Sequence, residues 1–349
     1  MGFRMLAKKI GVDLGTSSIV IAEYKKGVII DEPSVVALTT NDETVIAIGK
    51  NAQNMLGREP DSMQVVRPLR EGVIADYRIA EAMLTYFIRM VLGPLRLIKP
   101  KLMICVPLGI SNVEQRAIRD AALAAGSRKP PYLIIESVAA ALGSGLPIHS
   151  PRGHMVLNIG GGRTEAAVIS MFGVVASKSI RVGGDTFDSA IIDYIRKRHN
   201  LIIGSRAAEE IKINIGMAME SSDQKSIGIR GKDQLSGTPR TVSINSYEIT
   251  NAISVHLESI ALTVASVLDM TPPELASDVI DRGIMITGGG AYLKDIDKFL
   301  LLETGIPIHI SENPRHCVAI GALMGLDVVD SISSSFSDID IMYDFSDRE

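Results

Sequence analysis

The chain has 349 residues, a length that predicts two ordinary domains or one large two-lobed unit, and 46% of the residues are hydrophobic, enough for a substantial core. The net charge is −4 without a long basic run, which argues against a dedicated nucleic-acid binder, because such proteins gain affinity by neutralising phosphates. No apolar stretch reaches the roughly 18 residues that a transmembrane helix requires, so we expect a soluble, cytoplasmic protein.

The first part of the chain alternates predicted strands with helices. Residues 9–16 predict a strand that ends in a Gly-Thr turn, and the apolar runs at 19–22 and 28–30 predict two further strands. Apolar residues at helical spacing follow at 79–88. The apolar run 102–106 predicts the next strand.

A helix is predicted to begin directly after Ser111. The Ser111 hydroxyl suits an N-cap, and Glu114, three residues later, completes the pattern of a capping box. The helix should end near Ala125, because Gly126 is a common terminator. Residues 134–143 then predict a short strand that leads into another helix.

The pattern of the opening returns in the second part of the chain. Residues 154–169 again give an apolar strand, an Asp or Asn, a small Gly turn and a second strand. Asp13 corresponds to Asn158, and Gly15 corresponds to Gly160. A repeat at this long spacing is not a solenoid, so it predicts two lobes of similar build, each with one glycine turn.

A third glycine cluster follows at 284–291, where a predicted strand runs into three consecutive glycines and then a helix. Glycine turns of this kind bring backbone N–H groups close to phosphate oxygens, because no Cβ stands in the way. One such turn is weak evidence for a phosphate site, whereas two matching turns with a third glycine run are much stronger. No Walker A or GxGxxG motif follows a strand, which disfavours P-loop and Rossmann folds.

Asp13 directly precedes the first glycine turn. A carboxylate beside a phosphate site repels phosphate unless a cation lies between them, so one interpretation is that Asp13 holds Mg²⁺ through water. The alternative is an ordinary strand-end Asp that caps a turn. The repeat of the glycine turn favours the metal interpretation.

Over residues 9–327 the chain resembles the MreB family, the bacterial actin homologues. Seven stretches carry the resemblance, and several of them are specific to MreB within its superfamily: GVDLGT (11–16), EPSVVA (32–37), RPLREGVIAD (67–76), AAALGSGLP (139–147), RVGGD (181–185), EEIK (209–212) and TGGGA (287–291). The resemblance implies an α/β, actin-like (ribonuclease H-like) fold with two lobes and four subdomains, and with ATP or ADP and Mg²⁺ in the cleft between the lobes.

The resemblance also implies domain limits. The first lobe would span 1–145, with a small subdomain inserted at about 32–75. The second lobe would span 146–330, with a small subdomain inserted at about 183–242. Residues 331–349 are expected to be a disordered tail, because the segment from about Asp330 is rich in Ser and Asp and poor in apolar residues.

The resemblance assigns roles to individual positions of this sequence. The phosphates would be held by Thr16, Ser17, Ser18, Gly160, Gly161 and Gly162. The ribose and adenine would lie beside Glu209 and Lys212. The floor of the adenosine pocket would be formed by Gly288, Gly289, Gly290, Ala291 and Tyr292. Metal ligands would be Asp13 and Asn158, and the catalytic candidates are Glu136, Arg163 and Thr164.

Glu136 matches the glutamate that orients or deprotonates the attacking water in the family. The residues agree with this role, since Glu136 is a lone carboxylate that follows an apolar strand and precedes a helix. A plain carboxylate at a helix N-terminus, favoured by the helix dipole, is the alternative.

Three positions depart from the family pattern. Asn158 replaces an Asp, Arg163 replaces a Thr that helps to position water, and Ser18 replaces an Asn. Asn158 cannot carry charge for Mg²⁺ or take a proton. Arg163 can pair with the γ-phosphate, stabilise charge during transfer, or turn away to Glu165 or solvent. We therefore predict that ATP binds and is hydrolysed slowly.

A loop at 93–100 mixes apolar and basic residues. In MreB the matching loop dips two apolar residues into the bilayer, and Leu97 and Ile98 take those positions here, with Leu95 nearby. The resemblance thus implies a protein peripheral to the inner face of the cell membrane. The alternative is that the loop folds back on its own helix.

The partners implied are further copies of the chain in a filament, the membrane surface, and membrane proteins of the wall-elongation machinery, with no nucleic acid. The first function expected is a filament-forming cytoskeletal ATPase that directs cell shape through wall synthesis. A scaffold paralogue that binds ATP without hydrolysing it is the main alternative. A sugar or acetate kinase, or a heat-shock-type chaperone, is disfavoured by the MreB-specific stretches and by the absence of a substrate domain.

Overall fold

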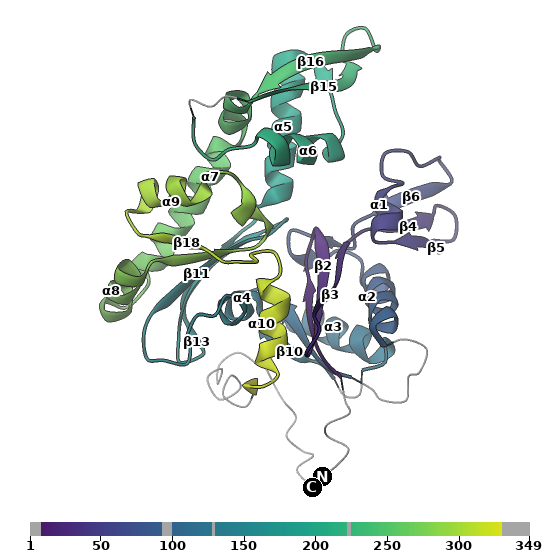
Figure 1. Cartoon of the computed structure of the whole chain (residues 1–349). Helices are drawn as coiled ribbons and strands as arrows, with labels where there is room; N and C mark the ends of the chain where they lie inside the picture. The colour runs from purple at the N-terminus through teal and green to yellow at the C-terminus, as the bar shows by residue number, and fades with distance from the viewer. Residues whose placement is uncertain (1–7, 93–99, 128–129, 222–224, 330–349) are drawn as a thin grey trace.

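The computed structural model describes residues 8–92, 100–127, 130–221 and 225–329 (Figure 1). Two five-stranded sheets dominate it. The first sheet has, in spatial order, β10 (Tyr132–Ile135), β9 (Lys101–Val106), β1 (Lys9–Leu14), β2 (Ser18–Glu23) and β3 (Gly27–Pro33). The second sheet has β18 (Ile308–Ile310), β17 (Ile284–Thr287), β11 (His154–Ile159), β12 (Thr164–Ser170) and β13 (Gly173–Ile180). We call the parts built on them the first half and the second half.

The two sheets have the same order and strand directions. In each, the central strand (β1 or β11) pairs antiparallel with the strand that follows it and parallel with a later strand (β9 or β17). The antiparallel pair needs only a short turn, whereas the parallel pair needs a long crossover. Both glycine turns therefore lie at the carboxyl end of a central strand.

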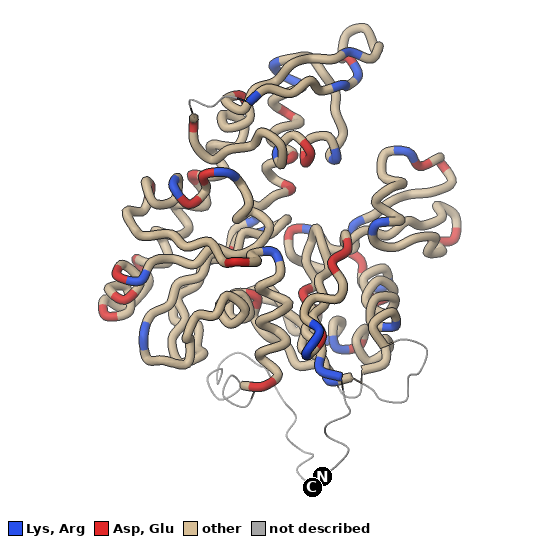
Figure 2. Tube along the Cα trace, in the orientation of Figure 1, with Lys and Arg blue, Asp and Glu red and all other residues tan. Residues whose placement is uncertain are grey.

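The central strands are covered on both faces. All six residues of β11 and all seven of β12 are buried, as expected for strands with helices on each side of the sheet. Figure 2 shows that many of the charged residues lie in the helices and loops around the two sheets, in both halves. Each half has its own aliphatic core, in which β1 and β9 residues pack on α2 (Tyr77–Leu92) in one half and β11 and β17 residues pack on α7 (Ser246–Asp269) in the other.

The helix predicted after Ser111 is confirmed as α3 (Asn112–Ala124). Glu114 N donates to Ser111 Oγ at 3.3 Å, and Ser111 N donates to Glu114 Oε2 at 2.9 Å, which is the reciprocal pattern of a capping box. The helix ends at Ala125, its C-cap, before Gly126 with φ of 108°. The sequence therefore placed both ends of this helix.

Two short helices made of small residues join the halves. Helix α4 (Glu136–Gly143) packs on α10 (Cys317–Gly325), and Figure 1 shows both between the sheets. A Cβ on Gly321 would lie 1.7 Å from Ala139 O, and one on Gly143 would lie 1.9 Å from Cys317 O. The two helix backbones therefore touch directly. This contact belongs to a core cluster that contains residues of both sheets.

Two small units project from the halves in the upper part of Figure 1. The first half carries a three-stranded sheet with a short helix: β5 (Val45–Ile48), β4 (Val36–Thr39), β6 (Met63–Val66) and α1 (Lys50–Gln53). A hairpin returns the chain to the first half: β7 (Leu69–Arg70) and β8 (Val73–Ile74). The second half carries a similar unit with two helices: β14 (Leu201–Ile202), β15 (Ser226–Asp233), β16 (Pro239–Asn245), α5 (Gly184–His199) and α6 (Ser205–Ile215).

Helix α7 is the one helix in the described part of the chain that is long and apolar enough to cross a bilayer. Its inward side chains, among them Ile253, Leu257, Ile260 and Val264, are fully buried in the core of the second half. A core helix passes the same test of length and composition. The remaining helices of this half are α8 (Pro273–Arg282) and α9 (Ile296–Thr304).

Candidate functional site

The two glycine turns face each other between the halves. The turn at 15–17 joins β1 to β2, and the turn at 160–162 joins β11 to β12. The first residue of each turn closes its hairpin in the same way. Gly15 N donates to Ser18 O at 3.0 Å, and Gly160 N donates to Arg163 O at 2.8 Å. The sequence repeat therefore gives two turns of matching hydrogen bonding.

Only glycine fits where these turns meet. A Cβ on Gly161 would lie 1.9 Å from Ser17 Oγ, and a Cβ on Gly162 would lie 2.8 Å from Thr16 Oγ1. Separations this short are overlaps rather than contacts, so any side chain at these positions would push the two turns apart. The absence of Cβ atoms lets the backbone of one turn approach the other.

The carbonyl groups of both turns are used within the protein. Ser34 donates to the carbonyls of the first turn, through Oγ to Gly15 O at 2.7 Å and through N to Ser17 O at 3.1 Å. The first amides of α5 do the same for the second turn, where Gly184 N and Asp185 N donate to its carbonyls at 3.0 Å and 2.8 Å.

The amide groups of the two residues that follow Gly15 and of the two that follow Gly160 are free by contrast. In the described part of the chain, the N–H groups of Thr16, Ser17, Gly161 and Gly162 donate to no protein oxygen. Backbone amides without a protein acceptor, arranged on two facing turns, are donors that an anion such as phosphate can satisfy. These residues therefore fit the phosphate groups of a nucleotide.

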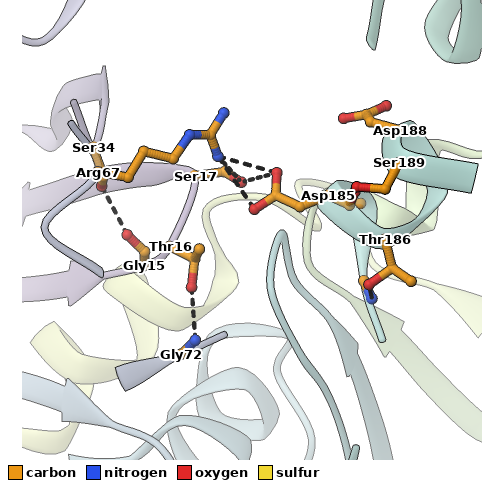
Figure 3. Close-up of polar contacts among 12 residues, drawn as sticks. Gly15, Thr16, Ser17, Ser34, Arg67, Gly72, Asp185, Thr186, Asp188 and Ser189 are labelled. Carbon is orange, nitrogen blue, oxygen red and sulfur yellow. Dashed lines mark hydrogen bonds and ion pairs between the residues drawn. The ribbon is translucent and has the colours of Figure 1, made fainter. Parts of the chain in front are cut away.

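The hydroxyls of the first turn contact protein groups, as Figure 3 shows. Gly72 N donates to Thr16 Oγ1 at 2.8 Å, so the Thr16 hydroxyl proton remains available for a ligand. Ser17 Oγ donates to Asp185 Oδ1 at 3.2 Å, and Arg67 Nη1 donates to both Asp185 oxygens at 3.0 Å and 3.2 Å. A phosphate bound by Ser17 would have to replace its contact with Asp185. Ser18, the third predicted hydroxyl, is the first residue of β2.

Several carboxylates lie close to one another near the two turns. Burial raises the pKa of Asp13 to about 7, with Arg315 lowering it and Asp31 raising it further. Burial also raises the pKa of Glu136 well above its usual range, and the nearby carboxylates Glu165 and Asp13 add to that shift. Acids held close together and poorly solvated favour a bound cation, because a cation removes their mutual repulsion.

Mg²⁺ fits this region with most of its ligands taken from water and phosphate. Within the described ranges, no group of three or more His, Cys, Asp or Glu side chains is placed to hold a metal ion. The Asn158 amide is buried and accepts a hydrogen bond from Thr287 Oγ1 at 3.2 Å, so its oxygen is already engaged. Asp13 is thus the charged protein group that would face the ion through water, the mode in which Mg²⁺ is commonly held.

Glu136 combines both interpretations made from the sequence. It is the first residue of α4, where the helix dipole favours a carboxylate, and it lies among the carboxylates below the turns. Burial and the neighbouring carboxylates raise its pKa more than the cation of Arg163 lowers it. A carboxylate with a raised pKa takes up a proton more readily than an ordinary one, which suits a general base.

Arg163 points neither to solvent nor to the free amides. Its side chain is 14% exposed, with Nε donating to Glu71 O at 3.2 Å and Nη1 donating to Leu108 O at 3.5 Å. Nη1 also lies 3.7 Å from Glu165 Oε1. Of the alternatives left open by the sequence, the structure has the one in which Arg163 pairs with Glu165. The neighbouring Thr164 is fully buried, and its hydroxyl donates to Val182 O at 2.7 Å.

Lys212 and Glu209 lie one turn apart on α6. Lys212 Nζ is 2.8 Å from Asp188 Oδ1 and donates to Gly184 O at 3.0 Å, which ties α6 to the start of α5. Burial raises the pKa of Asp188 to about 6, while Lys212 lowers it. Lys212 therefore lies near the second glycine turn, because the Gly184 amide bonds to that turn.

The third glycine run packs on the second turn. Gly288 has φ of 82°, and a Cβ on it would lie 2.3 Å from Ile159 O, while a Cβ on Gly290 would lie 2.2 Å from Ile159 Cγ2. A short 3-10 helix follows (Gly289–Tyr292), in which Ala291 is buried and Tyr292 is 64% exposed. Two of the three predicted glycine clusters are thus adjacent in space.

The membrane candidates Leu95, Leu97 and Ile98 lie outside the described residues.

A separate cavity of about 280 Å³ lies beside the start of α7 and the end of α6. It is lined by residues of which none belongs to the predicted site: Met217, Met219, Glu220, Ser221, Ser246, Tyr247 and Thr250.

Sequence reasoning missed the polar residues that connect the halves. Arg67, Glu71 and Asp185 lie in stretches that carried the family resemblance, but no role was assigned to them. Arg67 and Asp185 are 118 positions apart, and no local pattern indicates that they pair. Glu165 was considered only as one possible partner of Arg163.

Comparisons with known proteins agree with this geometry. The family model described as MreB/Mbl protein matches residues 7–334. The chain is 45% identical to the cell shape-determining protein Mbl of Bacillus subtilis over 328 residues, covering 94% of this chain and 98% of the relative. It is 43% identical to the cell shape-determining protein MreB of Escherichia coli over 335 residues, covering 93% and 95%.

Solved structures give the same result. The chain is similar to MreB5 of Spiroplasma citri bound to ADP, with a TM-score of 0.87 and 34% identity over 94% of this chain and 99% of that one. The MamK double helical filament, at 19% identity and a TM-score of 0.74, shares the fold, with 91% of this chain and 98% of that one covered. The actin-like α/β fold expected from the sequence is confirmed.

Proposed function

The chain belongs to the MreB/Mbl family, and from this premise we propose that it is an ATP-binding, actin-like cytoskeletal protein that assembles into filaments and helps to determine cell shape by organising wall synthesis. The observation that carries the proposal is the pair of facing glycine turns whose amides have no protein acceptor. The ADP and AMPPNP bound to MreB5 of Spiroplasma citri support a nucleotide as the ligand.

In this proposal the phosphates bind between the two turns. The amides of Thr16, Ser17, Gly161 and Gly162 donate to phosphate oxygens, while Glu209, Lys212 and the run from Gly288 to Tyr292 form the nucleoside side of the site. Asp13 would hold Mg²⁺ through water, and the ion would supply positive charge against the phosphates. Glu136 takes a proton from the attacking water. Hydrolysis is slow, because Asn158 and Arg163 replace an acid and a small hydroxyl.

The four-subdomain division belongs to the same proposal. The limits are those expected from the sequence, at 1–145 and 146–330 with insertions at about 32–75 and 183–242. The small sheets β5-β4-β6 and β14-β15-β16 support the two insertions. A scaffold that binds ATP without hydrolysing it remains the alternative, which steady-state phosphate release distinguishes.

Nucleotide binding is tested with a fluorescent ATP analogue and Mg²⁺. We expect the wild type to bind it and Gly161→Val to bind at least about tenfold more weakly, because the new side chain would overlap Ser17 and separate the turns. Gly228→Val is the matched control, since a Cβ there meets only Thr241 Cγ2 at 3.7 Å. Failure of the wild type to bind, or equal affinity of Gly161→Val, would contradict the proposed site. Sedimentation with ATP then separates a filament protein from a small-molecule kinase.

The proposal includes association with the membrane. The side chains proposed to contact the bilayer are Leu95, Leu97 and Ile98. Burial of one such side chain in lipid contributes about 1.5–3 kcal/mol, and a filament multiplies the contact. We expect filaments of the wild type to float with anionic liposomes in a density gradient and those of Leu97→Ser with Ile98→Ser to stay at the bottom of the gradient. Val113→Ser with Leu123→Ser, at exposed positions of α3, is the control. Unchanged binding of the loop variant would disprove this membrane contact.

A further inference from the structure

One residue of the first half is held by the second half through both its backbone N–H and its backbone carbonyl. Leu108, which follows β9, donates its N–H to Glu165 Oε1 at 2.9 Å, and its carbonyl accepts from Arg163 Nη1 at 3.5 Å. Arg163 and Glu165 flank Thr164 at the start of β12, so both side chains reach from the second sheet to the first half. Two groups of one strand thus fix a single residue across the boundary between the halves.

The same guanidinium reaches a second segment of the first half. Arg163 Nε donates to Glu71 O at 3.2 Å, in the turn between β7 and β8. A Cβ on Gly72, the next residue of that turn, would lie 2.9 Å from Arg163 Nε, and Gly72 has φ of 79°. The turn is therefore shaped to receive the arginine closely, and Arg163 ties two separate first-half segments to β12.

The pair is shielded from solvent. Arg163 is 14% exposed and Glu165 is 2% exposed, so salt screens their attraction far less than that of a surface pair. Glu165 Oε2 is buried and has no hydrogen-bond partner in the described structure. Removing Arg163 would leave this carboxylate buried without its cation, an arrangement that proteins avoid by rearranging or opening.

We propose that Arg163 and Glu165 form a clasp between the halves that slows the release of nucleotide. This inference rests on the proposed function, in which the phosphates lie between the facing turns, so that contacts holding the halves together also hold the ligand. Arg163 is then a positioning residue that holds the halves closed without touching phosphate. A threonine at this position is too short to reach either carbonyl, so the clasp depends on the departure from the family pattern.

Release of a fluorescent ADP analogue, chased with excess ATP in a stopped-flow instrument, tests the clasp. We expect Arg163→Thr to release the analogue at least about tenfold faster than the wild type. Arg163→Lys should give an intermediate rate, because lysine keeps a cation beside Glu165 but lacks the fork that serves two carbonyls. Arg196→Thr is the matched control, since among the described residues Arg196 pairs with Asp193 alone, on the exposed side of α5. Its release rate should equal that of the wild type.

Hydrogen exchange of the nucleotide-free protein gives a second readout that needs no ligand. The Leu108 amide should exchange faster in Arg163→Thr and in Glu165→Gln than in the wild type. Faster exchange with an unchanged rate of release would overturn the role in release, and unchanged exchange would overturn the clasp itself. A wild type that binds no nucleotide would refute the proposed function, while exchange at Leu108 would still decide the clasp.

Discussion

Replacing Gly321 by alanine is expected to lower the free energy of unfolding by about 3 kcal/mol, at the upper end of the range for overpacked cores. The new Cβ would lie 1.7 Å from Ala139 O and 2.9 Å from Gly143 N, both backbone atoms of α4. Backbone atoms cannot turn away as a side chain can, so α4 and α10 would have to separate. The midpoint of thermal unfolding should fall by roughly 6 °C.

The control for this experiment is Gly204→Ala. Gly204 has φ of −88°, and a Cβ built there meets no atom within 4 Å, so the change should stay within about 0.5 kcal/mol. Gly143→Ala should resemble Gly321→Ala, because its Cβ would lie 1.9 Å from Cys317 O. Equal stability of Gly321→Ala and Gly204→Ala would show that the two helices do not cross in backbone contact.

Restoring the family residues at both departures is expected to accelerate hydrolysis. We expect Asn158→Asp with Arg163→Thr to raise the single-turnover rate of phosphate release at least about tenfold. The Asp carboxylate would restore a charged group near the metal site, and the Thr hydroxyl would restore a group that helps to position the attacking water. Adding Glu136→Gln should then lower the rate at least about 100-fold, the usual contribution of a general base. Single-turnover conditions are needed because Arg163→Thr also changes nucleotide release.

The pH dependence of the same variants distinguishes the role of Glu136. A general base acts in its ionised form, and burial raises the pKa of Glu136 while the Arg163 cation lowers it. Without Arg163 the pKa rises further, so the rising limb of the rate profile should move to higher pH. The single variant Asn158→Asp keeps Arg163, so the rising limb of its rate profile should lie at lower pH than that of the double variant.

A wild-type rate of phosphate release equal to that of the double variant would contradict slow hydrolysis. An active Glu136→Gln would exclude Glu136 as the base.

Local signals in the sequence predicted several of the helices and strands and the glycine turns of a phosphate site. The capping box of Ser111 and Glu114 acts over three residues, and the glycine turns act over three or four, so each can be read without knowing the fold. The repeat of residues 9–22 at 154–169 predicted two matching glycine turns. The structure shows the same hydrogen bond closing each of them. Family resemblance supplied the fold class, which the solved relatives confirm.

Contacts between the halves were decided only by the tertiary structure. The sequence left three possibilities for Arg163, and the choice depends on Leu108 and Glu71, which are 55 and 92 positions away. The crossing of α4 and α10 likewise joins residues far apart, and small residues give no periodic signal strong enough to predict a partner. The raised pKa of Asp13 follows from burial and from the nearby Asp31 carboxylate, both of which depend on the folded chain. Caps and turns involve residues that are close in sequence, so the sequence determines them locally. Contacts between distant residues depend on how the two sheets pack against each other.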